Sequence, residues 1–146
     1  MTITMKNFTI LFVAISLCLA SCNKDHVGGC AEAEKISLTD AVVVSRGALV
    51  FSSLTKVNGI AKIYLQKNGR YVLGLEQVNV HSDTELVTYL SATPSLSATS
   101  IPLFSFKNIS SERFNLLPAN INGSSFGFVI IQGDTTPQPE AVAGLN

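Results

Sequence analysis

The chain has 146 residues, and its 10 basic and 10 acidic side chains give a formal net charge of zero at pH 7. This balance excludes the strongly basic surface typical of nucleic-acid-binding proteins, so no nucleic-acid partner is expected. Hydrophobic residues make up 47% of the sequence, enough for the packed core of one domain.

Residues 1–21 have the features of a lipoprotein signal peptide. Lys6 is a basic residue near the start, and the apolar run Phe8–Leu17 is too short to span a bilayer comfortably. The sequence Leu19-Ala20-Ser21-Cys22 resembles a bacterial lipobox. An ordinary secretory signal or a simple N-terminal membrane anchor is the alternative interpretation.

The lipobox resemblance implies cleavage before Cys22 and attachment of diacylglycerol to its sulfur. Two or three acyl chains hold a protein on a membrane, so membrane lipid is the first expected partner. Asn23 differs from the aspartate that resembles an inner-membrane retention signal, and we therefore expect the outer membrane, on either its periplasmic or its surface side. Residues 22–35 are predicted to form the lipid anchor and a flexible tether.

Cysteine use limits the redox chemistry of the mature chain. Cys18 leaves with the signal peptide and Cys22 carries the lipid, so Cys30 is the remaining thiol and no disulfide within the domain is expected. An unpaired cysteine in an oxidising compartment is buried, paired with another molecule or redox-active. Its polar, glycine-bearing surroundings favour an incidental or intermolecular thiol over a catalytic one.

Residues 36–146 are predicted to form one antiparallel β-domain, and its first elements are the clearest. The valine triplet that ends Glu34–Val44 favours an edge strand, because β-branched residues suit the extended backbone. Ala61, Ile63 and Leu65 then alternate with polar residues, which predicts a strand with these three side chains in the core.

Asn68-Gly69 predicts a hairpin with a tight type I′ turn, because both residues tolerate a positive φ. The partner strand begins at Tyr71, and its apolar pattern changes face near Gln77, which indicates a β-bulge. The remaining expected strands are 85–90, 101–106, 113–117, 125–132 and 140–145. We therefore predict a single β-sandwich or flattened barrel with about 7–9 short strands.

The sequence contains no recognisable catalytic constellation, cofactor motif or metal-ligand spacing. His81-Ser82-Asp83 are consecutive, so their side chains alternate between faces and cannot form a triad. Asp83 and Glu85 are read as a polar turn, with calcium binding as the weaker alternative. Tyr64 and Tyr89 lie opposite the apolar faces of their strands, and with Asp83 and Glu85 they form the candidate binding surface.

A family resemblance emerges from the order and spacing of several short motifs across residues 47–145. The motifs are Gly47–Leu54, Val57–Tyr64, Asn68-Gly69, Leu73–Glu76, Thr88–Ser91, Arg113–Pro118, Val129–Ile131 and Ala143–Leu145. Together they resemble the electron transfer DM-thirteen domain family. The resemblance implies an extracellular or envelope β-domain, and electron transfer through a cysteine has been proposed for this family.

The chain departs from that pattern where the proposed chemistry would take place. The resemblance places the family cysteine at the position occupied by Gln132, and the typical Gly-Pro-Asp-Leu stretch appears as Asp83-Thr84-Glu85-Leu86. A glutamine amide has no thiol-exchange chemistry. We therefore expect a non-catalytic, lipid-anchored module that binds an envelope protein or a glycan. The alternative is a redox component in which Cys30 replaces the missing cysteine.

Overall fold

The structure is a computed structural model that describes residues 35–52, 58–133, 135 and 137–146. Ile36–Asn146 form one compact unit. The predictions for the signal peptide, the lipobox, Cys22 and Cys30 lie outside the described residues.

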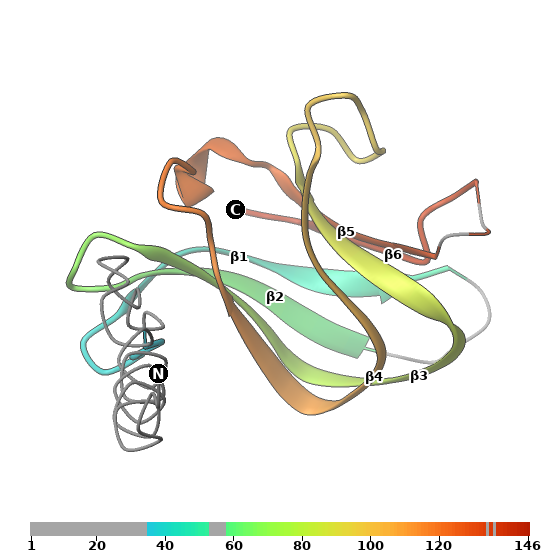
Figure 1. Cartoon of the computed structure of the whole chain (residues 1–146), viewed down its shortest axis with the longest axis horizontal. Helices are drawn as coiled ribbons and strands as arrows, with labels where there is room; N and C mark the ends of the chain where they lie inside the picture. Colours follow the sequence, from blue (N-terminus) through green and yellow to red (C-terminus); the bar gives the residue numbers. More distant parts are fainter. Residues whose placement is uncertain (1–34, 53–57, 134, 136) are drawn as a thin grey trace, which may run out of the picture. The chain divides into compact units, whose positions relative to one another are not determined.

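The described residues form six strands and one short 3-10 turn. The elements are β1 (Val42–Phe51), β2 (Asn58–Leu65), β3 (Tyr71–Ser91), β4 (Ile101–Leu116), η1 (Gly123–Ser125), β5 (Phe128–Gly133) and β6 (Ala141–Gly144). All pairings are antiparallel, in the order β2-β1-β6-β5-β3-β4. A further pairing between β2 and β3 closes five strands into a barrel, with β4 as an extra strand on β3 (Figure 1). The all-β prediction is confirmed. Of the two predicted alternatives, a sandwich and a flattened barrel, the structure has the barrel.

The predicted number of strands was wrong, because two pairs of expected short strands are continuous. Tyr71–Ser91 forms the single strand β3 and Ile101–Leu116 the single strand β4, and both bend along their length (Figure 1). His81 pairs with Asn108 and Leu86 with Phe106, and residues 82–85 between them are extra residues at an irregularity of the β3–β4 pairing. Because the residues on both sides of this irregularity pair with β4, the strand continues through a polar sequence that resembles a loop.

The bulge predicted near Gln77 is confirmed. The β3–β4 register shifts between Glu76 and Val78, where Gln77 has a φ of 54°. Ser111, which lies opposite Val78, has a φ of 75°. The extra residue lets apolar side chains on both sides of Gln77 reach the interior, since the face of the strand changes there.

The predicted hairpin at Asn68-Gly69 is present, but the turn is not of type I′. Gly69 has a φ of 83°, whereas Asn68 does not have a positive φ. The Gly69 N–H donates to the Gln66 carbonyl (2.9 Å), and the Gln66 N–H donates to the Arg70 carbonyl (2.8 Å). This is the pattern of a three-residue hairpin loop, in which a left-handed glycine follows a type I turn. The Asn68 side chain accepts from the Arg70 N–H (3.0 Å) and so stabilises that arrangement.

The core occupies the barrel interior. Ala61 and Ile63 are fully buried as predicted, while Leu65 is half-buried at the end of β2. The other buried apolar residues that pack together are Leu49, Leu73, Leu75, Val78, Val80, Leu86, Leu90, Phe106, Ile109, Leu117, Val129, Ile131, Ala141 and Ala143.

Strands β1 and β6 approach each other closely at Gly47. A Cβ atom on Gly47 would lie 2.0 Å from the backbone oxygen of Gly144, so this position has room for a glycine alone. Further along the same pair of strands, Val50 pairs with Val142 and Phe51 with Ala141. The start of the predicted strand Glu34–Val44 was wrong: β1 begins at Val42, after a turn in which the Ala41 N–H donates to the Leu38 carbonyl (3.2 Å).

Candidate functional site

Strand β1 carries an exposed apolar surface. The exposed large hydrophobic side chains of the described residues are Val42 (61% exposed), Val43 (42%), Val44 (36%) and Val50 (69%), and all four belong to β1. Val42–Val44 are consecutive and Val50 lies six residues further along the strand, so the four side chains are exposed on one strand but not in one contiguous patch. Exposed apolar side chains that gather on one element are candidates for contact with a partner. We call these four valines the β1 valine surface.

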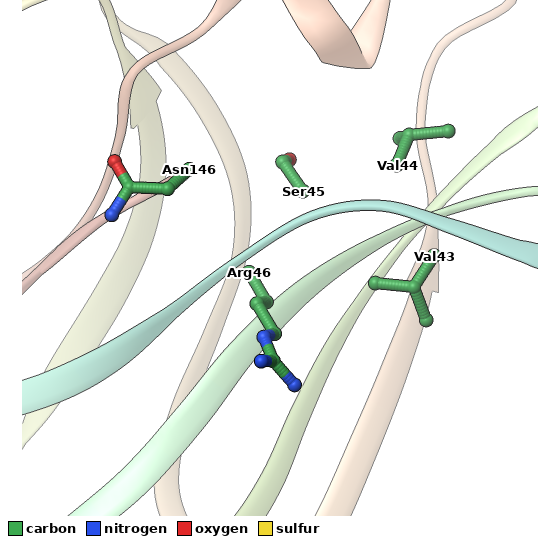
Figure 2. A pocket seen from close by; sticks show the side chains of 5 residues that line it. All are labelled: Val43, Val44, Ser45, Arg46 and Asn146. Atoms are coloured by element: carbon green, nitrogen blue, oxygen red, sulfur yellow. The ribbon is translucent and has the colours of Figure 1, made fainter.

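A cavity of about 260 Å³ lies at the start of this surface and is lined by Val43, Val44, Ser45, Arg46 and Asn146 (Figure 2). The β1–β2 register shifts between Val43 and Ser45, so Val44 is the extra residue of a bulge. In Figure 2, Val43 and Arg46 point to one side of the strand, and Val44 and Ser45 point to the other. The bulge therefore sets the two valines on opposite sides of the strand.

The β1–β6 pairing ends at this cavity. The Arg46 N–H donates to the Asn146 carbonyl (3.1 Å), and the Asn146 N–H donates back to the Arg46 carbonyl (3.0 Å). From Ser45 back to Val42, β1 pairs with β2 on one edge, and its other edge has no partner strand among the described residues. The cavity thus lies beside an open stretch of sheet edge.

The register extends this surface across the outside of β2. Val43 lies opposite Tyr64, and Arg46 lies opposite Lys62. Directly paired residues in an antiparallel sheet share a face, so Tyr64 and Lys62 border the exposed strand. The outer face of β2 is therefore adjacent to the exposed residues of β1.

A polar cluster on this face joins β2 to β3. Lys62 Nζ lies 2.5 Å from Glu76 Oε2, and the Tyr64 hydroxyl donates to Glu76 Oε1. The Tyr64 ring packs edge-on against Phe114, with ring centroids 6.2 Å apart. Gly74 makes room for this packing, since a Cβ there would lie 2.8 Å from the Phe114 ring.

The protonation equilibria of the cluster favour a structural role. Hydrogen bonding to Glu76 raises the pKa of Lys62, and burial followed by the bond to Glu76 raises the pKa of Tyr64. Burial acts to raise the pKa of Glu76, but the hydrogen bonds from Lys62 and Tyr64 outweigh it and leave that pKa below its ordinary value. All three shifts move the groups away from titration near pH 7, where a general acid or base is most effective. The cluster links β2 to β3, and the directions of its pKa shifts do not suit proton transfer near pH 7.

The predicted binding-surface residues are not gathered into one patch. Tyr64 is half-buried and lies opposite Val72 near the start of β3, whereas Tyr89 pairs with Ile130 near the end of β3. Asp83 and Glu85 lie between these positions and are exposed, and Glu85 accepts from the Ser105 hydroxyl (2.5 Å). Within the described residues, no group of three or more histidine, cysteine or acidic side chains could hold a metal ion.

Gln132 lies on β5, in the strand where the family resemblance predicts a cysteine. It pairs with Val87 of β3 and is half-buried. His81 is exposed and lies opposite Asn108. Neither position is part of the surface around β1.

Sequence reasoning missed Arg46, Lys62 and Glu76. The hairpin supplied a usable signal. Pairing about Asn68-Gly69 places Lys62 opposite Gly74, and Glu76 lies two residues further along β3 on the same face. No comparable local signal marked Arg46, whose surroundings depend on the bulge and on the distant Asn146.

Comparisons with known proteins give no neighbour for this chain: no family model, no curated protein and no solved structure matches it. The resemblance to the electron transfer DM-thirteen family therefore stays a prediction. None of the helices in the described part of the chain is long and apolar enough to cross a membrane.

Proposed function

We propose that the chain is a lipid-anchored, non-catalytic interaction module of the cell envelope whose contact surface is strand β1. The observation that carries this proposal is the β1 valine surface, which concentrates the exposed large apolar side chains of the described residues on one strand. Burial of such side chains against a partner is favourable, at about 25 cal/mol for each Å² of apolar surface removed from water.

The chemistry of this surface favours a protein partner over a glycan. Sugar rings bind well to exposed aromatic faces that are flanked by hydrogen-bonding groups. Tyr64, the aromatic residue paired with β1, is half-buried, and its hydroxyl is already bonded to Glu76. Arginine is enriched in protein interfaces, and the valines near Arg46 supply apolar area that another protein could bury.

Anchoring rests on the lipobox-like sequence that ends at Cys22. A lipid on this cysteine would leave residues 23–35 between the membrane and the compact unit. The redox alternative depends on Cys30, which lies outside the described residues. Cys30→Ser in the mature protein should leave partner binding unchanged, and loss of a reversible oxidation together with loss of binding would support the alternative.

Site-specific photo-cross-linking in intact cells tests the proposal. A benzophenone amino acid is placed at Val43 or Val50 on β1, and at the exposed Lys107 on β4 as a matched control. We expect discrete adducts of defined mass from both β1 positions and none of the same mass from Lys107. The proposal is wrong if the β1 positions give no adducts, or the same adducts as Lys107.

A further inference from the structure

We infer that the cavity at the start of β1 is the site where an extended, acidic segment of a partner protein adds as a strand beside Val42–Ser45. This inference rests on the proposed function, because it names the form and the charge of the partner that β1 binds. Three features carry it: a cavity that follows the strand edge, an arginine with no acidic partner among the described residues, and an edge that is not protected against pairing.

The cavity lies along the edge of β1 and not on one face of the sheet. It is lined by Val43 and Arg46 on one side of the strand and by Val44 and Ser45 on the other (Figure 2). The backbone bonds between Arg46 and Asn146 mark this edge as the one that faces β6, and towards the start of β1 it has no partner strand among the described residues. An occupant that touches both sides of the strand must follow its edge, and an extended backbone does so by adding to the sheet.

The Ser45 hydroxyl adds a polar group that such an occupant can satisfy. Its oxygen is buried and has no hydrogen-bond partner within the described part of the chain. Buried hydroxyls are normally hydrogen-bonded, and the N–H and C=O groups of an added strand can donate to this oxygen or accept from it. A purely apolar occupant, such as a lipid chain, would leave the hydroxyl without a partner.

The charges around Arg46 favour an acidic occupant. Arg46 lies directly opposite Lys62 in the β1–β2 register, and like charges in such a pair repel. The nearby Glu76 is already bonded to Lys62 and to the Tyr64 hydroxyl. Arg46 is exposed and forms no ion pair with any of the described residues. A carboxylate on the occupant would supply the counter-charge beside Arg46.

Asp40 determines where along the occupant this acid lies. Asp40 is exposed and belongs to the turn before β1, where its φ is 63°, at the opposite end of the open stretch from Arg46. An acidic side chain near Val42 would be repelled by Asp40, whereas one near Arg46 would be attracted. The acid of the occupant is therefore expected beside Arg46, with uncharged side chains beside the exposed Val43 and Val44.

The other open edge of the sheet is protected, whereas this one is not. Strand β4 also ends the sheet, but it carries Pro102, the exposed Lys107 and the positive φ of Ser111. Proline, lysine and local distortion keep strand edges from pairing with other chains. Val42–Ser45 contains no proline and no charged residue, and the bulge at Val44 interrupts the pairing with β2 on the opposite edge. A strand added along so short a stretch makes a contact below the roughly 1,200 Å² of a stable interface, so the binding is transient.

Selection from a library of random peptides displayed on phage tests the charge of the occupant. The full mature protein, lipid included and immobilised in detergent, is compared with its Arg46→Glu, Arg46→Gln and Lys107→Glu variants, and thermal unfolding checks that each variant is folded. We expect acidic residues to be enriched several-fold in the peptides that bind the wild type. Arg46→Gln should abolish this preference, and Arg46→Glu should replace it by a preference for basic residues. Lys107→Glu makes the same change of charge on β4 and should leave the acidic preference unchanged.

Hydrogen exchange tests whether the occupant adds as a strand. A peptide selected on the wild type should slow the exchange of backbone amides within Val42–Ser45 several-fold, because an added strand bonds to the backbone of its neighbour. A peptide held by side chains alone would leave the exchange of these amides unchanged, and that result would exclude strand addition.

The inference is also overturned if no peptides bind, if those that bind show no acidic preference, or if Arg46→Glu leaves the preference unchanged. Should one of these results be found while Val43 cross-links to a protein in cells, the acidic strand is wrong and β1 remains the contact surface. If Val43 and Val50 also give no cross-links, the proposed function fails as well.

Discussion

Replacing Gly47 by alanine tests the close approach of β1 and β6. The new Cβ would lie 2.0 Å from the Gly144 oxygen and 2.8 Å from the Gly144 carbonyl carbon, far inside van der Waals contact. Because both atoms belong to the backbone, a change of rotamer cannot relieve the overlap, and β6 must move away from β1. Overpacking of this kind costs about 1–3 kcal/mol. Displacement of β6 would also weaken the paired bonds between Arg46 and Asn146, each worth about 1 kcal/mol.

We therefore expect Gly47→Ala to lower the free energy of unfolding by about 2–4 kcal/mol, measured by urea denaturation followed by circular dichroism. Gly144→Ala is the matched control on the facing strand. Its Cβ would meet Phe128 at 3.7 Å, which is an ordinary contact, so we expect a change below about 1 kcal/mol. Equal stabilities of the two variants would refute the close approach of β1 and β6.

Three further predictions address the polar cluster, the hairpin and the anchor. Because the pKa of Glu76 is lowered in the folded protein, its stabilising contribution is present above the unfolded pKa of about 4.5 and is lost as the pH falls through the folded pKa. Glu76→Gln should therefore be less stable than the wild type at pH 7 by at most about 1 kcal/mol, with a smaller difference in acid; a difference that persists undiminished at low pH would contradict this. Gly69→Val should lose about 1–2 kcal/mol in thermal unfolding because Gly69 has a φ of 83°, and unchanged stability would argue against a left-handed residue there. Cys22→Ala should abolish incorporation of labelled palmitate, whereas equal labelling of wild type and variant would refute the lipoprotein assignment.

Local patterns in the sequence predicted those parts of the fold that depend on neighbouring residues. The alternation around Ile63, the hairpin at Asn68-Gly69 and the change of face at Gln77 each arise within a few residues, and the structure contains all three. The length of β3 and β4 could not be predicted in this way. Whether the polar segment at His81 forms a loop or a strand depends on its partner at Asn108, which is distant in sequence.

The candidate site was harder to predict than the fold. The valine triplet Val42–Val44 indicated a strand, but its exposure depends on the point where β6 stops covering the edge of β1, at Asn146. Tyr64 was assigned to the candidate binding surface, and it is half-buried beside Glu76. Both outcomes follow from strand pairing, which hydrophobic periodicity alone does not specify.

Cysteine accessibility in membranes tests most directly whether β1 is covered by a partner in the cell. Val43→Cys, Val50→Cys and Lys107→Cys are each prepared with Cys30→Ser, and a membrane-impermeant maleimide reacts with isolated membranes and with purified protein in detergent. If β1 is the contact surface, the cysteines at positions 43 and 50 will react several-fold more slowly in membranes than in the purified protein, while the cysteine at position 107 reacts equally in both. Equal rates in both preparations at all three positions would contradict the assignment of β1 as the contact surface.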